Sequence, residues 1–289
     1  MRLSSAVFLG SCLLAGFALT QAAAAVPDAP RDAPAVGSPE WIIDRFFVQK
    51  EFPDLDRYAT GEFAELYKAS PTLGSIVPPS VTVTVRVLER DESHAIFNVS
   101  MTDSNVTKEW YAYLRKEAGG FKLEAIRTLT LGAKFFETLV AAENAALGGR
   151  LNDLGAQELN RSHLTIASDA ELKHHFTAQK PLFDALETEF AALTSIDVVN
   201  FDGRTSPAGA IPPERTVALA QQLRALTLGA AIRNYRDCVD CVALVIGGDG
   251  ENQVGYLRVA PGAQVPRMSP QSFIYVESIA PGWYLFKTV

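Results

Sequence analysis

The sequence predicts an α+β protein with two domains, each of which has helices followed by an antiparallel β-sheet. Apolar residues recur at helical spacing before each of two groups of alternating runs. The segments that join the alternating runs are too short for parallel crossovers, so neighbouring strands must be antiparallel. The length of 289 residues exceeds that of one typical domain.

The N-terminus is typical of an exported protein. Residues 1–25 combine an early basic residue, an apolar stretch and a run of small residues, which predicts a secretory signal peptide cleaved before Val26. A retained membrane helix is disfavoured because Gly16 and Thr20 interrupt the apolar stretch. A lipid anchor at Cys12 is disfavoured because more apolar residues, rather than a polar linker, follow it. We therefore expect a periplasmic or secreted protein.

The first domain is expected at residues 38–147, after a flexible linker rich in Pro, Ala and Asp at residues 26–37. Ser38 is a good helix cap and Pro39 suits the first helical position. A short helix should follow, then four strands with short turns, then another helix. The expected ranges are 54–69 for the short helix, 81–88, 94–101, 107–117 and 121–131 for the strands, and 132–147 for the last helix.

The second domain is expected at residues 168–289, after a linker at residues 148–167 that reads as a loop with some helix. Ser168 and Glu171 form a capping box ahead of a long apolar stripe at helical spacing. Pro181 should kink or divide that helix. Another helix and five strands should follow, at residues 214–226 for the helix and 230–235, 242–248, 254–260, 272–279 and 282–289 for the strands.

Residues 38–131 resemble the cystatin-like or nuclear-transport-factor-two-like superfold, chiefly through the hairpin sequence EWYAYLRKEAGGFKLEAIRTL. The resemblance implies a pocket between the helices and the concave face of the sheet, where enzymes of that class place an inward-facing acid or base. The residues that would border such a pocket are Trp41, Asp44, Trp110 and Tyr111.

Residues 168–289 resemble an uncharacterised bacterial domain family. The likeness rests on the helical segment HHFTAQKPLF and on the ending VGYL…FIYVESIAPGWYLFKTV, in which a Gly-Tyr strand precedes a Trp-Tyr strand. This second resemblance implies a fold of helices followed by a sheet and implies no activity.

Cys238 and Cys241 are the only cysteines left after cleavage, and their spacing suits a redox pair, half of a metal site or a local disulfide. A redox pair needs a helix start to lower the thiol pKa, whereas these cysteines lie between predicted strands and beside Asp237 and Asp240. A zinc site needs four ligands, and no histidine lies nearby in sequence. We predict a local disulfide, with no metal and no cofactor.

Composition and motifs narrow the range of functions that the sequence allows. The chain has 26 basic and 33 acidic residues and no block of Lys or Arg, which argues against a nucleic-acid partner. Beyond residues 1–25 no stretch suits a membrane span, so we expect no membrane insertion after cleavage. His174 and His175 are adjacent on a helix and cannot chelate one ion together. Phosphate-loop and hydrolase motifs are absent from the sequence.

Our leading hypothesis is a non-catalytic exported module that binds a protein or a small ligand. One alternative is an isomerase-like or dehydratase-like enzyme that uses the pocket of the first domain. The other is thiol–disulfide exchange at Cys238 and Cys241.

Overall fold

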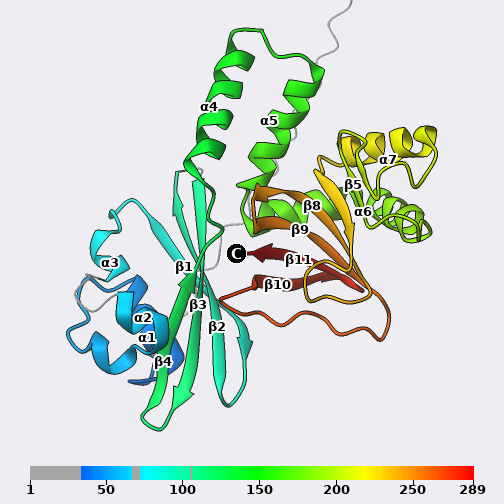
Figure 1. The fold of residues 1–289 in the computed structure, drawn as a ribbon. Helices are drawn as coiled ribbons and strands as arrows, with labels where there is room; N and C mark the ends of the chain where they lie inside the picture. Colours follow the sequence, from blue (N-terminus) through cyan, green and yellow to red (C-terminus); the bar gives the residue numbers. More distant parts are fainter. Residues whose placement is uncertain (1–33, 67–71, 105) are drawn as a thin grey trace, which may run out of the picture. The chain divides into compact units, whose positions relative to one another are not determined.

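The computed structural model describes residues 34–66, 72–104 and 106–289, and confirms an α+β fold with two antiparallel sheets (Figure 1). The predicted signal peptide, Cys12 and most of the predicted linker at residues 26–37 lie outside the described residues. Residues Pro34–Val289 form one compact unit.

The first half contains short helices, a four-stranded sheet and a longer helix. Its helices are α1 (Pro39–Phe47), the 3₁₀ helix η1 (Leu55–Tyr58), α2 (Gly61–Leu66), α3 (Leu73–Ile76) and α4 (Ala133–Leu147). Its strands are β1 (Thr82–Arg90), β2 (His94–Asp103), β3 (Val106–Glu117) and β4 (Gly120–Arg127), which pair antiparallel in chain order as the short turns predict.

The two faces of this sheet contact different parts of the chain. Phe97 and Leu114 lie in a core with α1 and α2, on the side where Figure 1 shows the short helices. Because side chains alternate along a strand, Ile96 and Tyr113 point the other way. They lie in a core that contains residues of the second half. The face that the resemblance predicts to enclose a pocket is the one that packs against α1 and α2, whereas the opposite face contacts the C-terminal sheet and α6.

The second half begins with helices and ends in a seven-stranded sheet with the order β10-β11-β9-β8-β7-β5-β6. Its helices are α5 (Asp153–Thr165), α6 (Asp169–Ala191) and α7 (Pro213–Ala225). Its strands are β5 (Val198–Asn200), β6 (Thr205–Ser206), β7 (Ala230–Arg233), β8 (Cys241–Asp249), β9 (Asn252–Val259), β10 (Phe273–Ala280) and β11 (Trp283–Thr288).

The long helix α6 supplies much of the second core. Phe176 and Phe183 are buried against the rings of Tyr256 and Trp283, with ring centroids 4.9–6.3 Å apart. The predicted capping box is present at Ser168. The helix continues through Pro181 and is not divided there. Its buried apolar stripe on both sides of the proline holds the helix together where one backbone hydrogen bond is missing.

Three local features depart from the sequence-based expectation. Residues 148–167, expected to be mostly loop, hold the 13-residue helix α5, which Asn152 caps by accepting a hydrogen bond from the Gly155 N–H. The strand expected at residues 121–131 ends at Arg127. The short strands β5 and β6 lie within segments for which the sequence predicts no strand. Strands of three and two residues are too short to show an alternation of apolar and polar side chains.

None of the helices in the described part of the chain combines the length and the apolar character that a membrane span requires.

The packing of α6 predicts different effects for two leucines of the same helix. Leu186 is fully buried, whereas Leu182 is 54% exposed. We expect Leu186→Ala to lower the free energy of unfolding by about 2–5 kcal/mol, because it leaves a cavity in the core. The matched control Leu182→Ala should change it by about 0.5 kcal/mol or less. Urea denaturation measures both, and equal effects would show that the face of α6 is wrongly assigned.

Candidate functional site

A network of buried polar side chains and a surface groove are candidates for function. The buried network begins on β3. Glu109 and Tyr111 are two residues apart and point to the face of the first sheet that contacts the second half. Asn98 of β2 lies directly opposite Tyr111 in the strand register. These three polar groups therefore gather at one place on the sheet.

The first residue of α6 enters this group. The Asp169 backbone N–H donates to both carboxylate oxygens of Glu109, at 3.1 and 3.0 Å. The first turn of a helix has free N–H groups and a partial positive charge, so a carboxylate is favoured there. The Asp169 side chain in turn accepts hydrogen bonds from the Tyr111 hydroxyl at 3.1 Å and from Asn98 Nδ2 at 3.2 Å.

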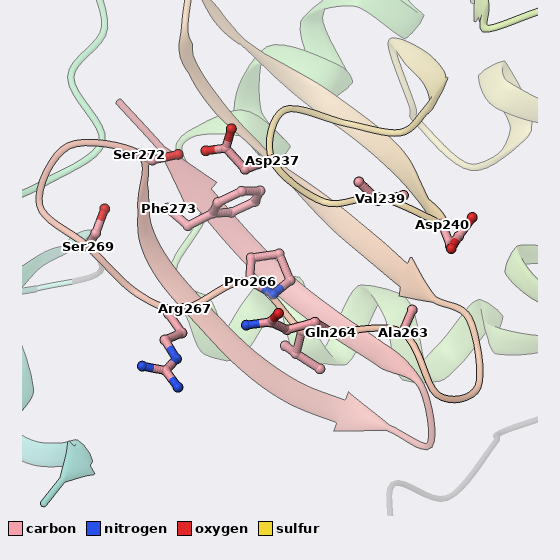
Figure 2. Close-up of a pocket in the computed structure, with 11 residues that line it drawn as sticks. Asp237, Val239, Asp240, Ala263, Gln264, Pro266, Arg267, Ser269, Ser272 and Phe273 are labelled. Carbon is pink, nitrogen blue, oxygen red and sulfur yellow. The ribbon is translucent and has the colours of Figure 1, made fainter.

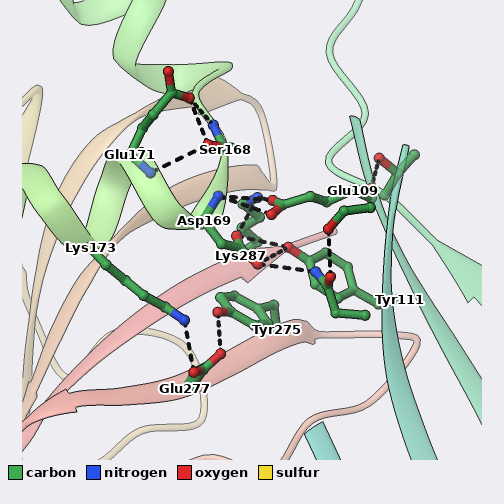
Figure 3. A network of polar contacts seen from close by, with 12 residues as sticks. Glu109, Tyr111, Ser168, Asp169, Glu171, Lys173, Tyr275, Glu277 and Lys287 are labelled. Carbon is green, nitrogen blue, oxygen red and sulfur yellow. Dashed lines mark hydrogen bonds and ion pairs between the residues drawn. The ribbon is translucent and has the colours of Figure 1, made fainter. Parts of the chain in front are cut away.

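Lys287 of β11 completes the network (Figure 3). Its Nζ lies 2.7 Å from Asp169 Oδ1 and 2.8 Å from Glu109 Oε2. The side chains are only 5% exposed for Lys287, 5% for Asp169 and 8% for Glu109. The ammonium also lies over the stacked rings of Tyr111 and Tyr275, whose centroids are 4.9 Å apart. Two buried carboxylates thus share one buried ammonium.

The two carboxylates respond differently to this environment. Burial raises the pKa of Glu109 to about 7 against the attraction of Lys287, and the nearby charge of Asp169 adds to the rise. Burial would also raise the pKa of Asp169, but the charge of Lys287 and hydrogen bonds from its neighbours outweigh burial and hold that pKa below its usual value. Glu109 is therefore the carboxyl of the pair that takes up a proton near neutral pH.

The other members of the network keep their ordinary charge states. Burial would lower the pKa of Lys287, but the two carboxylates raise it, so the amine stays protonated and is not a nucleophile. Burial and the adjacent Asp169 raise the pKa of Tyr111, so the phenol stays neutral. The chemical capacity of the network is to hold or release one proton at Glu109.

A second polar cluster lies beside the first. Glu277 of β10 accepts hydrogen bonds from Arg86 at 2.7 Å, from Lys173 at 2.7 Å and from the Tyr275 hydroxyl at 2.6 Å. Burial would raise the pKa of Glu277, but these three donors lower it to about 2. The cluster links β1, α6 and β10, so it is a further connection between the two halves.

The residues predicted to border a pocket lie in different surroundings within the described part of the chain. Trp41 packs on Phe52, with ring centroids 5.5 Å apart, and Asp44 accepts a hydrogen bond from the Gln49 side chain. Trp110 lies on the helix-facing side of β3, whereas Tyr111 lies on the opposite side. Of these four residues, only Tyr111 belongs to the buried network.

Sequence reasoning missed Glu109, Asp169 and Lys287. Lys287 continues the alternation of Trp283 and Leu285, both buried core residues, so its position in the last strand signals an inward-facing lysine. Asp169 lies inside the capping box and reads as an ordinary first-turn acid. Nothing local in the sequence indicates that the two side chains meet.

The predicted local disulfide is present between Cys238 and Cys241, whose Cα atoms are 5.6 Å apart. Both cysteines are buried, and Cys241 begins strand β8 rather than a helix. Beside the disulfide lies a groove of about 430 Å³ (Figure 2), with the turn at residues 237–240 on one side and the loop and strand start at residues 263–273 on the other.

The backbone of this turn is held in a conformation that most residues avoid. Asn234, Arg236 and Asp240 have φ angles of 48°, 53° and 59°, in the left-handed region. Each non-glycine residue in the left-handed region lowers the stability of the fold by on the order of 1 kcal/mol. The conformation persists only where contacts with the surrounding residues hold it. Here the Asn234 side chain accepts a hydrogen bond from the Asp240 N–H at 3.1 Å, and Arg236 donates to the Val289 carbonyl at 3.0 Å. The turn is therefore a rigid, pre-shaped element.

The histidines do not form a metal site in the described part of the chain, where no three His, Cys, Asp or Glu side chains are arranged to hold an ion. His175 is hydrogen-bonded to the Tyr256 hydroxyl at 2.9 Å, whereas His174 is exposed. His94 is exposed at the start of β2.

The shared ammonium predicts a large effect for Lys287. We expect Lys287→Met to lower the free energy of unfolding by about 3–5 kcal/mol, because it leaves two buried carboxylates without their counter-charge. The control Lys173→Met removes a half-exposed partner of Glu277 and should cost about 1 kcal/mol or less. Chemical denaturation at neutral pH compares them, and equally small effects would contradict the burial of the network.

The raised pKa of Glu109 predicts a pH-dependent effect of Glu109→Gln. An acid with a raised folded-state pKa stabilises the fold at low pH, and that contribution is lost as the pH rises from its usual 4.5 to about 7. Relative to the wild type, Glu109→Gln should therefore gain stability across this window, by about 3 kcal/mol. Urea denaturation at several pH values measures the difference. The exposed control Glu92→Gln should show no such trend, and a flat difference for Glu109→Gln would refute the shifted pKa.

The short disulfide loop predicts a small effect on global stability. Replacing both cysteines with serine should leave the protein folded, with a loss of about 2 kcal/mol or less, because the closed loop is short. Circular dichroism and denaturation test this. Collapse of the fold would mean that the turn is required for folding.

Comparison of the chain with protein-family models, with curated proteins and with solved structures finds no match. The resemblance of the first half to the cystatin-like superfold and that of the second half to a bacterial domain family therefore stay predictions.

Proposed function

We propose that this chain is a non-catalytic exported module that binds a segment of a partner protein in the groove beside the disulfide turn. The observation that carries the proposal is the rigid turn itself. Among the five non-glycine residues with positive φ in the described chain, three lie between positions 234 and 240. Left-handed residues that surrounding contacts hold in place cluster at binding sites, where a fixed shape lowers the entropy lost on binding.

The groove offers apolar and polar contacts together. Val239 is 69% exposed at the tip of the turn, and Phe273 lines the groove. An exposed apolar residue on a rigid turn is a favourable contact for an apolar side chain of a partner. Ser269 and Ser272 add hydroxyl groups to the opposite side of the groove.

The charges of the turn favour a basic partner segment. The side chains of Asp237 and Asp240 are exposed and form no ion pair or hydrogen bond within the described residues. Carboxylates in such positions are available to a lysine or arginine of a partner, and the pairing gives specificity and faster association. We therefore assign the groove to an extended segment with a basic residue between apolar residues.

Export is part of the same proposal. The signal-like residues 1–25 and the disulfide both suit an oxidising compartment outside the cytoplasm. In that compartment the disulfide stays formed and keeps the turn in its binding shape.

Short synthetic peptides test the proposal directly. Peptides with an arginine between two valines should bind with dissociation constants of about 10 μM to 1 mM, which is typical of a small surface groove. Matched peptides with glutamate in place of arginine should bind at least about tenfold more weakly. Chemical shifts of ¹⁵N-labelled protein should change at residues 237–240 and 263–273.

Two variants locate the interaction. Asp237→Asn with Asp240→Asn should abolish the preference for arginine, and Val239→Ser should weaken both peptide types. The matched control Asp54→Asn with Asp56→Asn alters two exposed aspartates elsewhere and should change nothing. Binding that maps outside the groove, or that ignores Asp237 and Asp240, would overturn the proposal.

A further inference from the structure

A second cavity, distinct from the groove, opens onto the buried network. It has a volume of about 260 Å³ and lies between β3, the segment that joins β4 to α4, and the segment that joins α5 to α6. Glu109 and Lys287, each less than one-tenth exposed, are among its lining residues. The cavity therefore gives a small molecule access to a buried ion pair.

The mouth of this cavity is apolar. Val106, Phe136 and Ile166 line it and are 73%, 47% and 42% exposed. These three large apolar side chains come from three separate elements and gather around one opening. Such an arrangement suits the apolar body of a ligand, which would shield them from water.

Behind the mouth of the cavity, negative charges outnumber positive charges. When ionised, Glu109 and Asp169 carry two negative charges against the single positive charge of Lys287, and Tyr111 and Asn98 add none. A buried excess charge is unfavourable unless a proton or another cation compensates it. Among the described residues, Glu109 Oε1 accepts only the hydrogen bond from the Asp169 N–H, so it can accept another donor.

We propose that this cavity binds a small organic ammonium compound, whose charged group reaches Glu109 and whose apolar body lies between Val106, Phe136 and Ile166. The ammonium supplies the positive charge that the network lacks, and the apolar body covers the exposed side chains at the mouth. An anion is disfavoured there, because Lys287 already contacts both carboxylates and faces the rings of Tyr111 and Tyr275. Lys108 also lines the cavity, but its ammonium lies over the ring of Trp110.

Phenethylammonium is a suitable probe, with 2-phenylethanol and 3-phenylpropionate as neutral and anionic analogues. At about pH 8 the ammonium probe should bind with a dissociation constant below about 1 mM, and at least about tenfold more tightly than the alcohol. Isothermal titration calorimetry on the full mature chain measures the constants. Amide chemical shifts should change at residues 106–109 and 165–167, and not at the disulfide turn.

The affinity should depend on pH through Glu109. This carboxyl faces Asp169 of α6, Lys287 of β11 and Tyr111 of β3, and it ionises as the pH rises past about 7. The probe stays protonated up to about pH 9, as an alkylamine does. Binding should therefore strengthen about tenfold between roughly pH 6 and pH 8.

Variants separate the two parts of the site. Glu109→Gln removes the excess charge without leaving Lys287 unpaired, so the protein stays folded and the preference for ammonium over alcohol should vanish. Ile166→Ser should weaken both probes, and the exposed control Glu92→Gln should weaken neither. Equal binding of all three probes, an ammonium preference that survives Glu109→Gln, or shift changes elsewhere would each overturn the proposal. The groove is a separate site. A failure of the ammonium proposal therefore does not bear on the proposal that the groove binds peptides.

Discussion

The contact on which the rest of the structure depends is the sharing of one buried ammonium by two carboxylates. Lys287 comes from the last strand, Asp169 from the start of α6 and Glu109 from β3, so the network joins both sheets and the longest described helix. Isolated buried charges are strongly unfavourable, so Lys287 and Asp169 are tolerated because each compensates the charge of the other. The network therefore specifies how the C-terminal elements meet the first sheet.

This constraint explains where accessible sites remain. The face of the first sheet that carries Tyr111 and Tyr113 is occupied by the second half, and the Tyr113 hydroxyl donates to the Ile274 carbonyl at 2.7 Å. A ligand must therefore bind at the border of the network or away from it. The cavity at Glu109 is at the border, and the groove beside Cys238 and Cys241 is away from it.

Local features of the sequence predicted much of the fold. Alternation and tight turns located the strands of the first sheet to within a few residues, and the capping box at Ser168 located the start of α6. The disulfide was predictable because its cysteines are three positions apart. The network was not, since Glu109 and Lys287 are 178 positions apart and only the packing of two sheets brings them together. The groove likewise depends on a distant loop and on left-handed residues that have no clear sequence signal.

A double-mutant cycle between Lys287 and Asp169 tests the central role of the network most directly. The free energies of unfolding of the wild type, Lys287→Met, Asp169→Leu and the double variant give the coupling between the two side chains independently of their other contacts. We expect a coupling of at least about 2 kcal/mol, because either charge left alone is buried without a partner. A coupling near zero would show that the two charges are solvated separately and do not hold the halves together.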